Sequence, residues 1–330
     1  MKFFFFFLFI LWGAIPAIAD FPTLQELDSH LFTNAAIIWQ APTNNLPKSF
    51  WVYERALPHV FPANVISNAI VLGSLQNRGF PRPSTNDFFI APPEPPEYPG
   101  PISTLFGIRP GDANLYFSLP DPDAFSSKGI PDDGTIIKLG QKYASQLGID
   151  PMKLASRKLY THFSDTGSNT VCGRGVFFSR NLDGTVFFSE ADEGESAEGF
   201  TIEFGGQGKI RSFSLRWSDI MPYKNERTAT LNEITRCVRA HKLIVMPNGE
   251  ESGYFRRLQA LAGTETLTIT KITPYYGEGI FGESPADDTP CRFITPFAEL
   301  DAVADFGTSK APVKLLSPIL ASEVSRMLKK

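Results

Sequence analysis

The sequence predicts an α+β protein in which helices cover one face of an antiparallel β-sheet. Two pairs of strand-like segments around short turns carry this prediction: 175–180 with 185–189, and 201–204 with 210–217. The first pair flanks Asn181-Leu182-Asp183-Gly184, and Asp-Gly between two apolar runs is a strong hairpin signal. Moreover, a helical segment followed by about three strands occurs at 132–217 and again at 230–316, which indicates repeated helix-plus-β-meander units.

The N-terminus predicts export. Lys2 precedes an apolar run at 3–15, and Ala17-Ile18-Ala19 supplies the small residues that signal peptidase reads. We therefore expect residues 1–19 to be a signal peptide that is cleaved near Ala19-Asp20, which leaves a secreted or periplasmic protein. The apolar run is too short to span a bilayer, so we expect no transmembrane segment after cleavage. The absence of any Asn-X-Ser/Thr sequon favours a bacterial envelope.

Composition describes a folded globular chain, with 13% aromatic and 20% charged residues. The net charge is −4, and charges of both signs are mixed along the chain, which argues against a nucleic-acid binder. We expect three regions after the signal peptide: 20–120, 121–228 and 229–330. The first is an N-terminal α+β region, the second a central helix with β-hairpins, and the third a C-terminal helix with a β-meander.

Helical and strand-like periodicities alternate through the first region. Helices are predicted at 22–32 and 62–76, where apolar residues recur at helical spacing, and strands at 35–39 and 49–53. The stretch 81–110 is dense in proline, which predicts an extended surface connection instead of a helix or a central strand.

Capping signals define the helices of the other two regions. Asp132 or Asp133 caps a helix that ends at 147, and Thr230 forms a capping box with Glu233. A short helix is predicted at 253–262, and Ser317-Pro318 begins the last one. The remaining predicted strands are 114–119, 153–163, 266–272, 292–306 and 313–316.

Several of these segments together resemble exported bacterial proteins built from PepSY-like modules and accessory regulators of sensor kinases of the YycH and YycI type. The segments are Trp51-Val52-Tyr53, the capped helix from Pro131-Asp132-Asp133 to Gln146-Leu147-Gly148, Gly208-Lys209-Ile210-Arg211-Ser212-Phe213, and Thr295-Pro296-Phe297. The resemblance covers roughly 50–320 and implies a non-catalytic, protein-binding role outside the cytoplasm. A cleaved signal in place of a membrane anchor sets this chain apart from the kinase regulators, and no functional residue carries over.

Cysteine and histidine patterns indicate no metal or catalytic centre. Cys172, Cys237 and Cys291 have no metal-ligand spacing. Two interpretations stay open: one disulfide with one free thiol, or three small buried side chains. The four histidines form no spaced metal pair. The Gly-rich turn 205–208 lacks the pattern of a phosphate loop, and the loop 194–199 lacks that of a nucleophile elbow. We assign no catalytic residue and no cofactor.

The acidic loop 190–198 is one candidate site. Its carboxylates Glu190, Asp192, Glu193 and Glu195 suit Ca²⁺ chemically, although their spacing does not match an EF-hand. A solvated loop that protects a strand edge is the alternative. Acidic residues facing each other across a cleft would instead make a secreted hydrolase, for example one that acts on carbohydrate.

Aromatic residues at strand ends are the other candidates. Trp217, Tyr223, Tyr275 and Tyr276 are placed where amphipathic rings often line partner-binding surfaces, although packing explains them equally well. The function that the sequence favours is that of an exported, non-catalytic protein that binds a protein or peptide. A secreted hydrolase and a calcium-dependent surface module are the alternatives.

Overall fold

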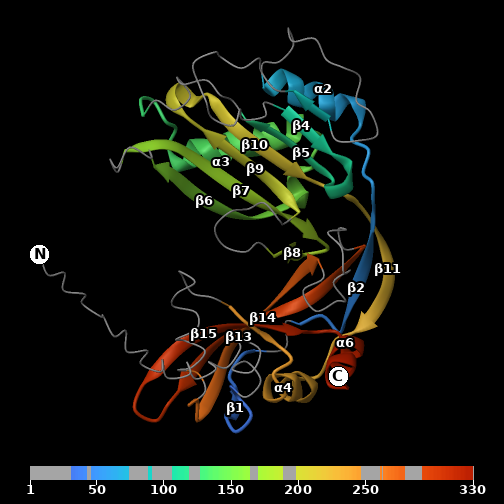
Figure 1. Cartoon of the computed structure of the whole chain (residues 1–330), viewed down its shortest axis with the longest axis vertical. Helices are drawn as coiled ribbons and strands as arrows, with labels where there is room; N and C mark the ends of the chain where they lie inside the picture. Colours follow the sequence, from blue (N-terminus) through green and yellow to red (C-terminus); the bar gives the residue numbers. More distant parts are fainter. Residues whose placement is uncertain are drawn as a thin grey trace, which may run out of the picture.

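The computed structural model describes residues 31–42, 46–73, 88–90, 106–118, 127–163, 170–188, 198–246, 261, 263–278 and 292–329. The strands of these residues join into one hydrogen-bonded sheet. This sheet runs through two lobes, an upper one and a lower one (Figure 1). A two-stranded ribbon of β2 (Ser49–Ala56) and β11 (Asp219–Arg227) runs along one side from the lower lobe to the upper one. The fold is therefore of the α+β type.

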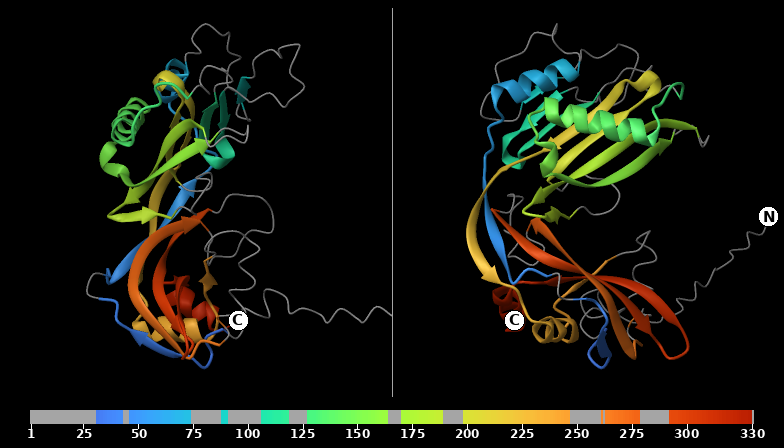
Figure 2. Two further views of the ribbon diagram at one scale, coloured as in Figure 1. Left: turned by 90° about the vertical axis from the view of Figure 1, so that its left-hand side faces the viewer. Right: turned by 180° about the vertical axis from the view of Figure 1, so that it is seen from behind.

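The upper lobe is an antiparallel sheet with a helix across its back. Its strand order is β6-β7-β9-β10-β5-β4-β3. Figure 2, in its right-hand view from behind, shows α3 crossing this back face of the sheet, where it contacts β7 and β9. The elements of this lobe are α2 (Ala63–Leu72), β3 (Phe88–Ile90), β4 (Phe106–Arg109), β5 (Asn114–Ser118), α3 (Asp133–Gln146), β6 (Leu154–Phe163), β7 (Val171–Leu182), β9 (Gly199–Phe204) and β10 (Ile210–Arg216).

Alternation along the strands builds the apolar core of the upper lobe. Ile202 and Phe204 lie on the helix side of β9 and are fully buried beneath Ile136 of α3. Asp132 caps α3 by accepting a hydrogen bond from the Thr135 backbone N–H (2.7 Å). Gly140 allows close packing of this helix, because a Cβ there would lie 2.7 Å from the Phe178 ring.

The lower lobe is built on three long antiparallel strands, β13, β14 and β15, with β1 parallel to β13. Thr230 and Glu233 form the expected capping box of α4, whose Ile234 and Val238 are buried. The elements of this lobe are β1 (Ala36–Trp39), β8 (Thr185–Phe187), α4 (Leu231–Arg239), β12 (Ile244–Val245), β13 (Thr266–Glu278), β14 (Phe293–Asp305), β15 (Lys310–Pro318) and α6 (Ala321–Met327).

Two expectations from the sequence need correction. The sheet is mixed, because β13 pairs in parallel with both β1 and β8, whereas the sequence predicted antiparallel pairing. Adjacent strands in the chain signal hairpins, but these parallel pairs join segments that are distant in sequence. The proline-rich stretch 81–110 is not only an extended connection, since it contains β3 and β4, which pair with each other.

A third expectation is also wrong: the last helix begins at Ala321, because Ser317 and Pro318 lie at the end of β15. The other expectations are confirmed or stay predictions. The hairpin at 181–184, the helices at 132–147 and 230–241 and the three last strands occur in the structure with shifted ends. The helices expected at 22–32 and 253–262 lie outside the described residues, apart from Leu31, Phe32 and Leu261. The repeated units and the three-region division stay predictions; each of the two large apolar cores draws residues from more than one of those regions.

Cys172 in β7 and Cys237 in α4 are free and buried, so they do not form a disulfide with each other. Cys291 lies outside the described residues. Burial raises the pKa of the Cys237 thiol to about 11, which suits a small core side chain. Within the part of the chain that the structure describes, no helix is long and apolar enough to cross a membrane.

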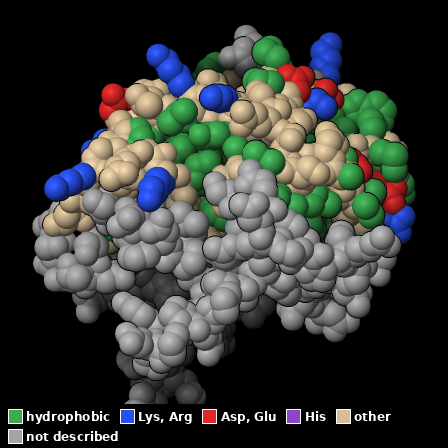
Figure 3. All heavy atoms as spheres, turned by 90° about the horizontal axis from the view of Figure 1, so that it is seen from above, with side chains coloured by type: hydrophobic (Ala, Val, Ile, Leu, Met, Phe, Trp, Pro, Cys, Tyr) green, Lys and Arg blue, Asp and Glu red, His purple; other side chains and the backbone are tan. Residues whose placement is uncertain are grey.

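The top of the upper lobe carries apolar surface. α2 lies at this end of the molecule and contains no charged residue. Its Val71 is exposed, and Ile66 and Ile70 are half-buried. Figure 3, which looks down on this end, shows hydrophobic side chains gathered beside residues that are not described.

Candidate functional site

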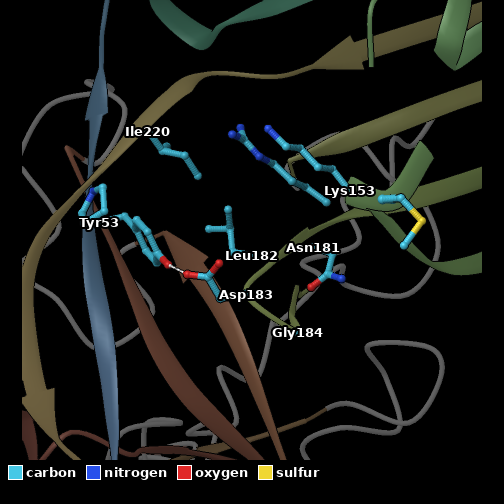
Figure 4. A pocket seen from close by; sticks show the side chains of 10 residues that line it. Tyr53, Lys153, Asn181, Leu182, Asp183, Gly184 and Ile220 are labelled. Carbon is cyan, nitrogen blue, oxygen red and sulfur yellow. Dashed lines mark hydrogen bonds between the residues drawn. The ribbon is translucent and has the colours of Figure 1, made fainter. Parts of the chain in front are cut away.

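A hollow of about 420 Å³ lies where the upper lobe meets the ribbon (Figure 4). Met152 and Lys153, in the turn before β6, line it from the upper lobe. The end of β7 and its turn, 180–184, form a second wall. The ribbon side chains Tyr53, Ile220 and Pro222 close the other side. Small-ligand pockets have volumes of this order and similar mixtures of apolar walls with a few polar groups.

The turn between β7 and β8 places Asp183 in the hollow. Asp183 (φ 49°) and Gly184 (φ 85°) both have left-handed backbone conformations, as a two-residue hairpin turn requires. The Asp183 carboxylate points to Tyr53, whose hydroxyl donates to Oδ2 (2.5 Å; Figure 4). Burial and this hydrogen bond raise the pKa of Tyr53 above its usual range. The ribbon is thus tied to the tip of the β7–β8 hairpin.

A buried ionic cluster lies beside the hollow. Its centre is Glu198, just before β9, which is fully buried and accepts from Arg55 Nη2 (2.7 Å) and Arg180 Nη1 (3.0 Å). The backbone N–H and the hydroxyl of Ser218 also donate to this carboxylate. Because Arg55 belongs to the ribbon and Arg180 to β7, Glu198 links the ribbon to the upper-lobe sheet.

A second carboxylate extends the cluster to the lower lobe. Glu278, the last residue of β13, accepts from Arg55 and from Arg216 Nη2 (3.1 Å). Arg180 also donates to the Ser218 carbonyl (2.6 Å), and its guanidinium lies 4.4 Å from the centroid of the Trp217 ring. Both lobes and the ribbon therefore contribute charges to one buried cluster.

Burial and nearby carboxylates shift the pKa values of the basic side chains in and beside this cluster in opposite directions. Burial alone would lower the pKa of Arg55, but Glu278 and Glu198 outweigh it and the pKa is raised. Burial lowers the pKa of Arg180 despite Glu198. Burial also lowers the pKa of His59, whose Nδ1 lies 3.4 Å from Asp219 Oδ2. His59 is thus held in its neutral form near neutral pH.

The structure places the four aromatic candidates in different environments. Trp217 lies under Arg180 at the ionic cluster. Tyr276 is buried, and its hydroxyl donates to the Trp51 carbonyl (3.0 Å). Tyr275 is half-buried, with its ring 5.3 Å from that of Phe188.

Tyr223 on β11 is 58% exposed and is therefore accessible to a partner. Its ring lies 4.9 Å from that of Phe293. These four aromatic side chains do not form one surface. The acidic-loop candidates Glu190, Asp192, Glu193 and Glu195 lie outside the described residues, and only Glu198 at the end of that loop is seen.

The ionic cluster was missed by reasoning from the sequence. Its members are up to 223 positions apart, so no local spacing brings them together. One signal was present: Arg55 and Arg180 interrupt strand-like segments, and a charge in a buried strand requires a partner. Among the described residues, no group of three His, Cys, Asp or Glu side chains is arranged to hold a metal ion.

An edge strand begins next to the hollow. β6 starts at Leu154, directly after Lys153, and among the described strands it pairs with β7 alone. Its exposed side chains include Leu159 (38%) and Phe163 (52%). An edge strand with apolar side chains can pair with a strand of another chain.

Comparisons with known proteins add little to this geometry. No protein-family model matches the sequence, and no curated protein matches it either. Among solved structures, the chain is similar to the crystal structure of an uncharacterised protein from Eubacterium rectale, with a TM-score of 0.43 and 11% sequence identity over 86% of each chain. This likeness is too distant to bear on function.

Proposed function

We propose that this chain is an exported, non-catalytic binding protein that takes up an extended segment of a partner protein or peptide along β6. The observation that supports this proposal is the edge of β6, ten residues long, which lies at one side of the upper sheet and leads into the hollow. Addition of a strand to an open sheet edge is a common mode of peptide recognition, in which backbone hydrogen bonds supply affinity.

The backbone of β6 offers hydrogen-bonding groups on its outer side. The Arg180 N–H donates to the Glu198 carbonyl, so the even-numbered residues of β7 direct their backbone groups to β9. Residues 175 and 177 therefore face β6, where they pair with Tyr160 and Lys158. Leu159 and Thr161 alternate with these, and their N–H and C=O groups point away from β7.

Charge indicates which partner suits this edge. The segment 151–163 contains Lys153, Arg157 and Lys158 and no Asp or Glu, although the whole chain has a net charge of −4. Two copies pairing through this edge would bring like charges together, which disfavours self-association. An acidic segment is the complementary partner.

A second edge strand, β11 of the ribbon, is less suited to strand addition than β6. β11 contains Pro222, which lacks a backbone N–H, and an irregular register between Pro222 and Lys224. Proline, bulges and lysine are features that protect edges. The hydrolase alternative gains no support from Glu198, because its carboxylate is engaged by Arg55, Arg180 and Ser218.

The proposal is tested by removing one outward N–H from β6. Thr161→Pro removes that group without removing a hydrogen bond to β7, so the fold should be retained. We expect wild-type mature protein to select acidic, extended sequences from an array of random ten-residue peptides, and we expect Thr161→Pro to lose most of this binding. Fluorescence anisotropy of the selected peptides measures the loss.

Thr161→Val is the matched control, because it keeps the N–H and should bind as the wild type does. Hydrogen exchange gives an independent readout, since bound peptide should protect the Leu159 and Thr161 amides. Equal binding by the proline and valine variants would contradict strand addition. The export part of the proposal requires that mature protein recovered from the native envelope begin at Asp20, which mass spectrometry determines.

A further inference from the structure

We propose that the hollow beside β6 takes the C-terminal carboxylate of the segment that lies along this strand. This inference rests on the proposed function and adds to it a defined anchor for the end of the peptide. It would make the protein a reader of free carboxyl termini, not of internal sequences.

Two cationic side chains converge on the hollow. Lys153 extends into it from the upper lobe (Figure 4), and no ion pair joins it to any described residue. Arg180 lines the same hollow, and only 6% of its surface is exposed. Arg180 Nη1 is engaged by Glu198 and the Ser218 carbonyl, whereas its buried Nε has no hydrogen-bond partner in the part of the chain described. Because Arg180 is already paired with Glu198, Lys153 supplies the unpaired positive charge and Arg180 Nε supplies a spare N–H donor, a combination that suits a carboxylate.

The amide oxygen of the half-buried Asn181 supports the presence of a polar ligand. Asn181 belongs to the wall of the hollow that β7 and its turn form. Its Oδ1 atom is buried and has no hydrogen-bond partner among the described residues. Buried polar atoms are rarely left without a partner in native proteins. Because the two ends of an amide are assigned by their surroundings, this side chain can donate to a carboxylate or accept from a peptide N–H.

The one acid in the hollow does not oppose an incoming carboxylate directly. Asp183 is turned to Tyr53 and accepts its hydroxyl (Figure 4). The remaining walls are apolar and come from Met152, Leu182 and Ile220. They suit an apolar side chain on the last residue of the peptide.

The position of the hollow sets the direction of the peptide. It lies at the start of β6, because Lys153 immediately precedes Leu154. A peptide whose carboxyl end is in the hollow must therefore run antiparallel to β6. Antiparallel pairing is also slightly more stable per residue than parallel pairing.

The test compares each peptide selected on the array in two synthetic forms, one with a free carboxylate and one with a C-terminal amide. We expect the free acid to bind the wild-type protein about tenfold more tightly than the amide, as loss of a charge-assisted hydrogen bond predicts. Lys153→Met, which keeps the apolar stem but removes the charge, should abolish most of this difference. Lys138→Met, on the exposed face of α3, is the matched control and should leave it unchanged.

Nuclear magnetic resonance locates the site independently. Free acid added to labelled protein should shift the amide resonances of Asn181 and Gly184, and the amide form should not. If both forms bind equally and still depend on the N–H of Thr161, the carboxylate site is overturned and the proposed function stands. If no peptide on the array binds in either form, both proposals fall.

Discussion

Two buried glutamates of this protein lie in opposite environments. Glu198 at the junction of the lobes accepts hydrogen bonds from Arg55, Arg180 and Ser218. Glu323 on α6 is 9% exposed, and its Oε2 has no hydrogen-bond partner among the described residues. Burial raises the pKa of Glu323 to about 7; Glu226 of β11 raises it further, while Arg326 and Thr295 lower it.

The difference shows that burial alone does not decide what a carboxylate does to stability. A buried charge with matched, hydrogen-bonded partners is costly to break, whereas a buried carboxyl without them is stable only when protonated. The lobe interiors consist of apolar side chains, but the junction consists of charges. Apolar burial thus stabilises each lobe, and directional ion pairs join the lobes through defined atoms.

Removal of the central carboxylate should have the largest effect. Glu198→Gln leaves Arg180 buried without a counter-ion and deprives Arg55 of one of its two carboxylates. Breaking a buried pair in this way costs about 3–5 kcal/mol. Urea denaturation at neutral pH measures this loss in the free energy of unfolding.

Glu233→Gln is the control for the loss of a glutamate charge. Glu233 pairs with Arg227 at the exposed start of α4, where exposed pairs contribute little. We expect a much smaller loss there. Equal losses in the two variants would mean that the junction charges are no more important than surface pairs.

The pH dependence of unfolding should reveal Glu323. Its folded pKa of about 7 exceeds the ordinary 4.5, so the unfolded chain releases this proton first as pH rises. Stability from this group is complete below pH 4.5 and is lost between pH 4.5 and 7, by on the order of 3 kcal/mol. Above pH 7 the contribution is constant.

Glu323→Gln isolates this effect, because the amide keeps the shape and does not titrate. The variant should match the wild type at pH 4.5 and exceed it in the free energy of unfolding at pH 7.5. Burial lowers the pKa of His59 in both proteins alike, so its contribution cancels in the difference. Parallel pH profiles for the two proteins would disprove a raised pKa for Glu323.

Local signals in the sequence predicted the elements around the site. Asp183-Gly184 specified the β7–β8 turn, Asp132 the start of α3, and Thr230 with Glu233 the start of α4. Each signal acts over a few residues, where backbone geometry and capping chemistry leave few alternatives.

Pairing between distant segments was not predicted. The parallel partners of β13 come from chain positions far before it, and no local pattern encodes such pairing. The same holds for Glu198, whose partners Arg55 and Arg180 lie 143 and 18 positions away. Aromatic content suggested Tyr275 and Tyr276 as binding residues, but Tyr276 is buried beside Tyr53.

Loss of the hydrogen bond between Tyr53 and Asp183, which joins the ribbon to the end of β7, should have the smallest effect on stability of the changes considered. Tyr53→Phe removes the donor, and Asp183→Asn removes the charge while an asparagine keeps the left-handed turn conformation. Each change should cost about 1.5–3 kcal/mol, as expected for a hydrogen bond to a charged group. The double variant should lose less than the sum of the two, because both changes remove one interaction, and urea denaturation of all four proteins measures that coupling. Additive losses would show that the two side chains act separately and that their hydrogen bond does not hold the hairpin tip to the ribbon.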